Sequence, residues 1–444
     1  MMTAGPLGKS RQDRPCATDF IVASRQCEID DLSHLMRMGQ LVAVISNLIH
    51  ALQRERGASN VHLGSGGERF AAQLDDLRAA SDELARTFYG ALNEVASRTI
   101  GVQSGARLFS RIAHAVHVLE GLTPLRARIR ALDLAPDEAV RHYSAMVGSL
   151  LAVVFEAADA AMDPTISRLL VAMFNFMQGK ELAGQERALG AAGFAQGEFD
   201  AAHAERLSDL IEGQERCFDI FAEFADADSQ ALWCTALGAT DQAEVERLRR
   251  LACTGNLSAL IRSESASAHI SDHWFLLMTA RIDAMKEVED HLEDQLQALC
   301  VERLEQARLR LAEHESRIGA LQQTDVAEPD ALNKDAVEEK GSFVVFCGPE
   351  RYSSESLSPR LGRAIIEMVH DQSQRLQSMQ DELDAAREAL EERKVVERAK
   401  ALLMKHRKLQ EDDAHRLLRK MAMNQGKRLV DVARAVVSMA DVLG

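Results

Sequence analysis

The stretch RKVVERAKALLMKHRKLQEDDAHRLLRKMAMNQGKRLVDVAR, residues 393–434, decides the fold of the C-terminal part of this chain. Its apolar residues recur at helical spacing, which indicates two short helices at about 411–424 and 427–442 behind the end of a longer one. Gly426 lies between them, where a helix commonly ends. The stretch holds 13 Lys or Arg and 5 Asp or Glu, a net charge of +8, whereas the whole chain carries −16. A small basic module therefore ends a large acidic chain, and this asymmetry predicts that the module binds a polyanion.

The composition of the chain favours an all-α protein. Of its 444 residues, 46% are hydrophobic but only 5% are aromatic, and long segments rich in Ala and Leu contain no proline.

The seven cysteines are scattered without metal-ligand spacing, which is typical of reduced thiols in the cytoplasm. The N-terminus lacks an apolar signal segment, and no uncharged apolar run is long enough to cross a bilayer. We therefore expect a cytoplasmic protein that does not span a membrane.

The acidic part of the chain contains a series of amphipathic segments. Helical spacing of apolar residues begins near Ile29, and the following segments lie at about 68–95, 104–131, 137–161, 164–196, 199–224, 228–252 and 256–299. So many helices exceed one small bundle, and we expect two four-helix bundles. The similarity of QRERGA (53–58) to GQERAL (184–189) supports a duplicated bundle.

The predicted organisation has five parts. It comprises a disordered tail over 1–28, a helical body with a long C-terminal helix over 29–321, an irregular linker over 322–358, a coiled-coil helix over 359–392 and the basic three-helix module over 393–444. Within the linker, SFVVFC (342–347) has the character of one short strand.

The helix over 359–392 carries a heptad seam. Apolar residues recur at alternating steps of four and three, with one polar exception, at Ile365, Val369, Gln372, Leu376, Met379, Leu383, Ala386 and Leu390. Such a seam predicts a coiled coil and hence a homodimer of the C-terminal part. The alternative is a helix docked on the protein's own acidic body.

The basic module has two interpretations from charge alone. A charge run is usually a solvated surface, but here the charge has one sign and lies opposite apolar stripes, as phosphate neutralisation requires.

The segments ERKVVERAKALLM (392–404), AHRLLRKMAM (414–423) and RLVDVARA (428–435) resemble the ANTAR domain. This resemblance implies a three-helix module of transcription antiterminators that binds paired hairpins in a leader RNA, usually as a dimer. It assigns RNA contact to Arg393, Arg398, Lys400, Arg419, Lys420 and Arg428.

Three arginine motifs lie within the acidic body. They are QRERGAS (53–59), QGKELAGQERALGAAGFA (178–195) and ERLRRLAC (246–253). Spacing alone favours ordinary Arg–Glu pairs on a bundle surface. The motifs, however, resemble those of the NIT domain, a helical domain of two four-helix bundles that senses nitrate and nitrite. The resemblance implies Arg56 and Arg249 as the principal anion ligands, with Arg187 in support, and no cofactor.

The sequence contains no recognisable catalytic constellation. His114 and His117 are three residues apart on one helix, but no third metal ligand is apparent, and nucleotide-binding or nucleophile motifs are missing. We therefore expect a regulator and no enzyme. The two resemblances together imply a nitrate-responsive antiterminator in which ligand relieves autoinhibition. The alternatives are a ligand-independent nucleic-acid-binding protein on a helical scaffold and a protein–protein interaction scaffold.

Overall fold

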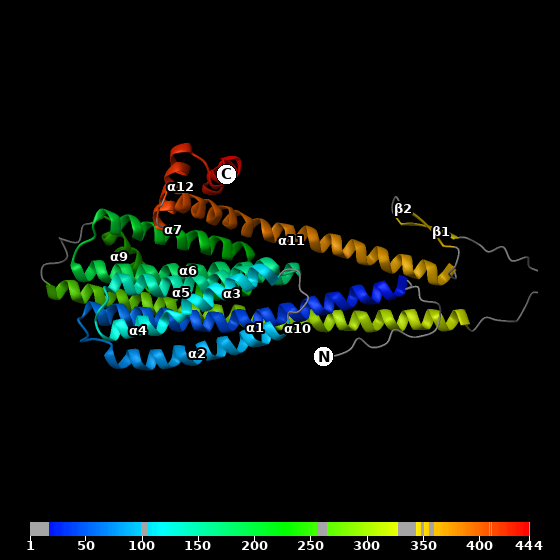
Figure 1. The fold of residues 1–444 in the computed structure, drawn as a ribbon, viewed down its shortest axis with the longest axis horizontal. Helices are drawn as coiled ribbons and strands as arrows, with labels where there is room; N and C mark the ends of the chain where they lie inside the picture. The colour runs from blue at the N-terminus through cyan, green and yellow to red at the C-terminus, as the bar shows by residue number, and fades with distance from the viewer. Residues whose placement is uncertain are drawn as a thin grey trace, which may run out of the picture. The chain divides into compact units, whose positions relative to one another are not determined.

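The computed structural model describes residues 17–98, 105–254, 264–326, 343–347, 350–354, 359–407, 409 and 411–443. Within these residues the protein is helical apart from one short hairpin (Figure 1). The helices are α1 (Ala17–Gly64), α2 (Ala71–Arg98), α3 (Gly105–Glu120), α4 (Leu122–Arg130), α5 (Pro136–Ala160), α6 (Pro164–Gln196), α7 (Ala201–Phe224), α8 (Ala227–Gly238), α9 (Gln242–Thr254), α10 (Glu264–Val326), α11 (Pro359–Arg407), α12 (Glu411–Gln425) and α13 (Leu429–Leu443). The predicted all-α fold class is confirmed.

Two predicted boundaries of irregular structure were wrong. The helix α1 begins at Ala17, well inside the expected disordered tail over 1–28, because Ile21 and Ile29 continue its buried apolar face. The helix α10 continues to Val326, beyond the expected start of the linker at 322. Residues 1–16 lie outside the described residues.

The expected short strand is one half of an antiparallel hairpin. The strands β1 (Phe343–Cys347) and β2 (Glu350–Ser354) pair along their full length, from Phe343 opposite Ser354 to Cys347 opposite Glu350. The rest of the predicted linker after Val326 lies outside the described residues.

One compact unit joins residues 1–37 to residues 298–380. It contains the start of α1, the end of α10 and the start of α11, with Ile29, Leu32 and Leu304 among its buried residues. Glu28 pairs with Arg375 of α11 at 2.5 Å. The seam residue Leu376 is 57% exposed, as a residue that packs against a second chain would be. The coiled-coil dimer stays a prediction.

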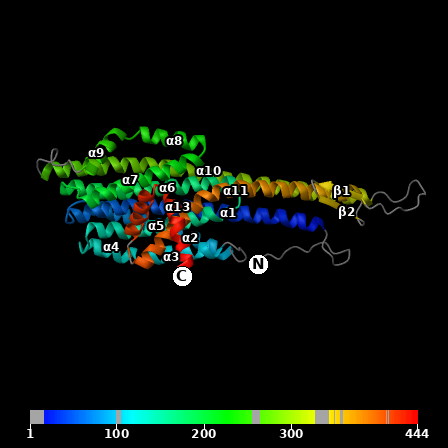
Figure 2. The same cartoon turned by 90° about the horizontal axis from the view of Figure 1, so that it is seen from above.

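The second compact unit joins residues 38–297 to residues 381–444. Its helices form two sets, one of α1, α2, α3–α4 and α5 and one of α6, α7, α8–α9 and α10. Helices α6 and α7 lie side by side in both views (Figure 2). Two segments expected as single helices are each divided, at Gly121 and at 239–241. Asp163 and Asp226 cap α6 and α8 by accepting backbone N–H groups, which fixes where those helices begin.

Two helices are long and apolar enough to span a membrane by length and composition, Thr18–Gly64 and Pro136–Ala160. Two-thirds of each apolar window is buried inside the protein. Both helices therefore serve as core helices of the bundles, and their apolar surface is used in packing.

The C-terminal module is built on the end of α11 with α12 and α13. Its core is formed by Ala399, Leu418, Ala422, Val432 and Ala433. Gly426 takes the left-handed conformation, with φ of 59°, at the end of α12, as expected. The long helix α11 runs without interruption into the module, so a displacement of this helix would be transmitted to α12 and α13.

Candidate functional site

Two of the predicted anion ligands, Arg56 and Arg187, lie together where the two bundles meet. Arg56 comes from α1 and Arg187 from α6, and both side chains are almost completely buried. The surrounding groups come from α5 and α10, so one helix pair from each bundle contributes. We call Arg56, Arg187 and their partners Gln53, Ser144, Glu181 and Thr279 the interface cluster.

The guanidinium of Arg56 is only partly paired. Its Nη1 donates to Ser144 Oγ at 2.8 Å and to the carboxylate of Glu181. Its Nε and Nη2 are buried and have no acceptor among the described residues. These two N–H groups point in parallel along one edge of the guanidinium, which is the edge that holds a planar oxyanion in a bidentate manner.

Arg187 completes the positive charge of the interface cluster. Its Nη1 donates to Thr279 Oγ1 at 2.9 Å, its Nη2 donates to the carbonyl of Gln53 at 3.1 Å, and its Nε has no acceptor among the described residues. The guanidinium lies 4.9 Å from the ring centre of Phe275. Burial and the charge of Arg56 lower the pKa of Arg187 to about 10. A bound anion would relieve this electrostatic cost, since it restores a partner to the charged form.

Two glycines allow the arginines to approach the opposite helix. A Cβ atom on Gly57 of α1 would collide with Arg187 Nη2, and a Cβ atom on Gly184 of α6 would collide with Arg56 Nη2. The relation is reciprocal, because each helix provides one arginine and the glycine that receives the other. Gly57 and Gly184 are therefore requirements of the interface cluster.

The structure places Arg249, which was predicted as a principal ligand together with Arg56, in a different cluster. Its Nε and Nη2 form a bidentate pair with Glu186 of α6, both at 2.7 Å, and its Nη1 donates to Glu246 at 2.8 Å. Gln214 of α7 donates to the same glutamate at 2.7 Å. No contact joins Arg249 to Arg56 among the described residues, so the two predicted principal ligands are not brought together in this conformation. We call this group the second-bundle hub.

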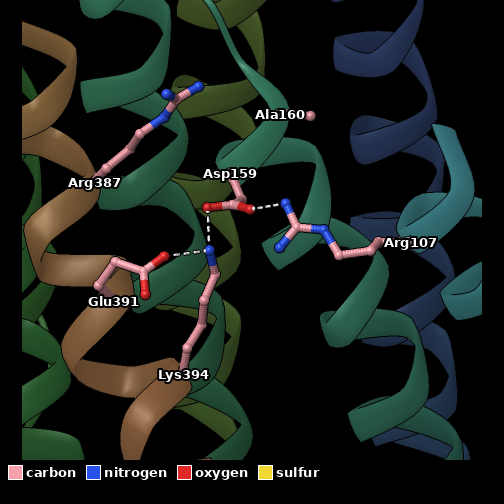
Figure 3. A pocket seen from close by; sticks show the side chains of 6 residues that line it. All are labelled: Arg107, Asp159, Ala160, Arg387, Glu391 and Lys394. Carbon is pink, nitrogen blue, oxygen red and sulfur yellow. Dashed lines mark hydrogen bonds and ion pairs between the residues drawn. The ribbon is translucent and has the colours of Figure 1, made fainter. Parts of the chain in front are cut away.

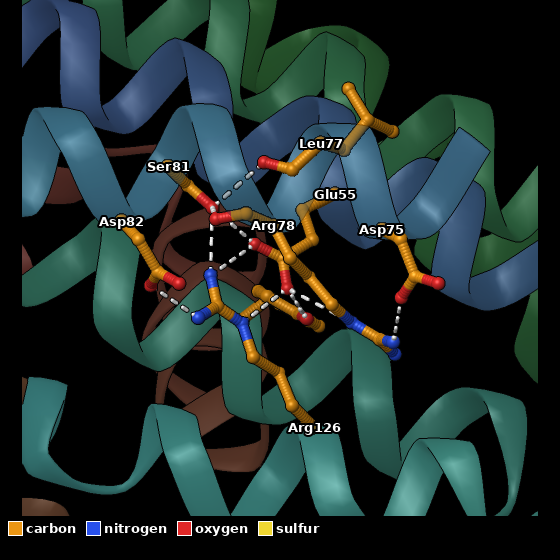
Figure 4. A network of polar contacts seen from close by, with 8 residues as sticks. Glu55, Asp75, Leu77, Arg78, Ser81, Asp82 and Arg126 are labelled. Atoms are coloured by element: carbon orange, nitrogen blue, oxygen red, sulfur yellow. Dashed lines mark hydrogen bonds and ion pairs between the residues drawn. The ribbon is translucent and has the colours of Figure 1, made fainter. Parts of the chain in front are cut away.

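A matching hub, which the sequence analysis did not identify, lies inside the first bundle (Figure 4). Glu55 of α1 is fully buried and accepts from Arg126 Nε at 2.7 Å and Nη2 at 2.8 Å. Ser81 and Tyr143 donate to it at 2.6 and 2.8 Å. Arg126 also donates to Asp82 through Nη1. The first-bundle hub therefore ties α1, α2, α4 and α5 together through one carboxylate.

Part of the predicted RNA-binding surface contacts the acidic face of α7. Arg419 of α12 pairs with Asp209 and, at 2.6 Å, with Glu212. Arg416 lies 3.9 Å from Glu205 on the same helix. One predicted RNA contact is thus occupied by carboxylates of α7.

A second contact holds α11 to the first bundle (Figure 3). Asp159 at the end of α5 is largely buried and accepts from Arg107 at 2.7 Å and from Lys394 at 2.5 Å. The surrounding pocket, about 260 Å³ in volume, is also lined by Arg387 and Glu391. Burial lowers the pKa of Lys394, but the hydrogen bonds that it donates to Asp159 and Glu391 outweigh burial and raise the pKa overall.

The other predicted RNA contacts differ in their surroundings. Lys400 pairs with Glu397 at 2.8 Å, and Arg428 lies 3.5 Å from both Glu392 and Asp431. Lys420 and Arg398 are exposed. Arg393 is part of α11, and its side chain lies outside the described residues.

Comparison with known proteins identifies both parts of the chain. Residues 47–297 match the family model described as nitrate and nitrite sensing (NIT), and residues 384–437 match the ANTAR domain. A nitrate regulatory protein of Klebsiella oxytoca is 36% identical over 425 residues, which cover 96% of each chain. The solved structure of the NasR transcription antiterminator is 34% identical, has a TM-score of 0.57, and is matched over 96% of this chain and 100% of that one.

The fold and the comparisons define a two-domain regulator, with a helical anion sensor and a helical RNA-binding module, and not an enzyme. The chain belongs to the family of nitrate- and nitrite-sensing regulators that combine a NIT domain with an ANTAR domain.

Proposed function

We propose that this chain is a cytoplasmic regulator that senses nitrate or nitrite at the interface cluster and binds paired hairpins in a leader RNA. In doing so it promotes transcription antitermination of nitrate assimilation genes. The observation that carries the sensor part is the buried Nε–Nη2 edge of Arg56, which has no acceptor among the described residues. Buried polar groups are nearly always paired, so an unfilled pair of donors in a cluster of two arginines and one carboxylate indicates a ligand position.

The chemistry of the interface cluster suits nitrate and nitrite. Both are planar monoanions with adjacent acceptor oxygens, and they are weakly hydrated, so their transfer into a buried site costs less than for a small hard anion. Arg56 offers a bidentate edge, and Arg187 offers one further N–H. Arg56, Arg187 and Glu181, which pairs with Arg56, together carry one net positive charge, which a monoanion neutralises.

Arg249 enters this proposal through Glu186, the residue before Arg187 on α6. By holding Glu186 inside the second bundle, Arg249 fixes the rotation of α6 and therefore the direction in which Arg187 points. We therefore assign direct anion contact to Arg56 and Arg187 and a positioning role to Arg249.

The proposed output is release of the module from α7. Helices α6 and α7 pack closely, because Gly179 faces the ring of Phe218 and Gly213 faces Leu182. A shift of α6 on anion binding would therefore displace α7, which carries the partners of Arg419. Freed from these carboxylates, Arg419 becomes available to RNA phosphates. The seam of α11 then supports a homodimer that grips two hairpins.

Calorimetric titration of the full chain with nitrate tests the sensor. We expect binding by the wild type and a loss of at least tenfold in affinity for Arg56→Lys, which keeps the charge but removes the bidentate edge. No heat with nitrate or nitrite, or equal binding by this variant, would favour a ligand-independent scaffold.

A second experiment tests the output separately. The double substitution Asp209→Asn with Glu212→Gln removes the carboxylates that hold Arg419 but leaves every predicted RNA contact intact. We expect this variant to bind a two-hairpin leader RNA without nitrate, whereas the wild type requires nitrate. RNA binding that stays nitrate-dependent in the variant would show that α7 does not mask the module.

A further inference from the structure

The partner of Arg56 has a role that its pairing alone does not explain. Glu181 is 1% exposed, and both of its oxygens are used. Its Oε1 accepts from Arg56 Nη1 and from Gln185 at 2.8 Å, while its Oε2 accepts from Gln53 at 2.9 Å. The carboxylate is thus held in place on α6 independently of the arginine.

This arrangement decides which part of Arg56 is available. Glu181 and Ser144 both bind Nη1, so the opposite edge, formed by Nε and Nη2, remains unfilled. Had the carboxylate paired with Nε and Nη2, as Glu186 does with two nitrogens of Arg249, the bidentate edge would be occupied. The monodentate contact therefore orients Arg56 and leaves its stronger anion-binding edge free.

Glu181 also determines the charge of the interface cluster. Two buried arginines without a carboxylate would carry +2 and would best accommodate a dianion or two monoanions. With Glu181 in place the excess is +1, and a buried site tolerates little uncompensated charge. Three other nearby charges do not change this balance. Lys180 is paired with Glu289, and Asp283 and Arg54 act on Arg187 with opposite signs.

We propose that Glu181 is a positioning and specificity-determining residue, which presents the free edge of Arg56 and restricts the ligand to a single negative charge. The inference rests on the proposed anion site. It predicts that sulfate, a dianion of common occurrence, is rejected chiefly by the carboxylate of Glu181, because a bound sulfate would leave the buried cluster with a net negative charge.

The test compares nitrate and sulfate binding by the full chain and by Glu181→Gln. The glutamine oxygen can still accept from Arg56, and Gln53, whose own Oε1 lacks a partner among the described residues, can turn its amide to accept from the new NH2 group. We expect the sulfate affinity of the variant to rise at least tenfold more than its nitrate affinity. Glu120→Gln, the same change on an exposed helix, controls for the net charge of the protein.

The outcomes separate this inference from the proposed site. If the wild type binds nitrate and Arg56→Lys does not, but Glu181→Gln keeps the wild-type preference for nitrate over sulfate, only the role of Glu181 is overturned. If the wild type binds no nitrate, the site itself fails. Glu181→Asp keeps the charge but withdraws the acceptor, so it should still reject sulfate while binding nitrate more weakly. Equal binding of sulfate and nitrate by Glu181→Asp would also overturn the inference, even if Glu181→Gln does not fold.

Discussion

The polar clusters inside the two bundles are built around a glutamate, whereas the cluster between the bundles is built around two arginines. In the hubs, all three nitrogens of Arg126 and of Arg249 donate to acceptors. Burial alone would lower the pKa of each of these arginines, but hydrogen bonds to Glu55 and to Glu186 outweigh it and raise the pKa. In the interface cluster the pKa of Arg187 is lowered, and buried donors remain unfilled. Arg78 beside the first-bundle hub also has a buried Nε and Nη2 without an acceptor, but it pairs with Asp75 and lies 4.0 Å from the carboxylate of Glu55. The interface cluster differs because its two arginines share a single paired carboxylate, Glu181, which leaves charge for a ligand to neutralise.

The same dipeptide generates both kinds of cluster. Glu55–Arg56 on α1 and Glu186–Arg187 on α6 each place the glutamate toward their own bundle and the arginine toward the interface. Consecutive residues of a helix point about 100° apart, so one Glu–Arg step can serve a hub and a ligand site at once. The internal similarity of the two motifs therefore reflects a shared arrangement within a pair of bundles.

The largest effect on the free energy of unfolding should come from removing the charge at the centre of a hub. Glu55→Gln leaves Arg126 buried opposite a neutral group, and loss of one partner of a buried ion pair costs about 3–5 kcal/mol. We expect the free energy of unfolding in urea to fall by that amount, while Glu83→Gln, the same change at an exposed position of α2, stays near the wild type. A Glu55→Gln variant as stable as the wild type would show that the hubs do not stabilise the fold more than the interface cluster does.

A smaller effect is expected where the interface requires a glycine. In Gly184→Ala the new methyl group collides with Arg56 Nη2, and overpacking of this kind costs about 1–3 kcal/mol. Displacement of Arg56 should also weaken nitrate binding. Gly148→Ala, on α5 with open space around the added methyl, should instead gain up to about 1 kcal/mol from helix propensity. Equal behaviour of the two variants in thermal unfolding and nitrate titration would contradict the close approach of Arg56 to α6.

Much of this architecture could be predicted from the sequence. Helical periodicity predicted the order of the helices. Arg56, Arg249 and Arg187 were predicted as anion ligands only from the resemblance to the NIT domain, since spacing alone favoured ordinary Arg–Glu pairs. The boundaries at Ala17 and Val326 were not predicted, since a helix extended by packing against another helix leaves only a weak periodic signal.

The partners of the arginines could not be predicted in the same way. Glu181 and Arg126 lie among many charged helix residues, and nothing local distinguishes a buried charge from a solvated one. The choice between Glu181 and Glu186 as the partner of Arg56 depends on the rotation of α6, which tertiary packing decides. For the same reason Arg249 was placed with Arg56 from the motif, although the structure pairs it with Glu186.

The smallest change in stability should follow removal of an arginine from the interface cluster. In Arg187→Met a flexible apolar chain replaces a guanidinium whose charged form burial and Arg56 already disfavour, and the thioether can pack on Phe275. The free energy of unfolding should therefore stay within about 1 kcal/mol of the wild type, while Arg126→Met in the first-bundle hub loses about 3–5 kcal/mol because Glu55 is left unpaired. Nitrate affinity should fall about tenfold in Arg187→Met, which corresponds to one lost charged hydrogen bond. If Arg187→Met were instead as destabilising as Arg126→Met, Arg187 would be a structural ion pair like those of the hubs, and the anion would have to be held by Arg56 alone.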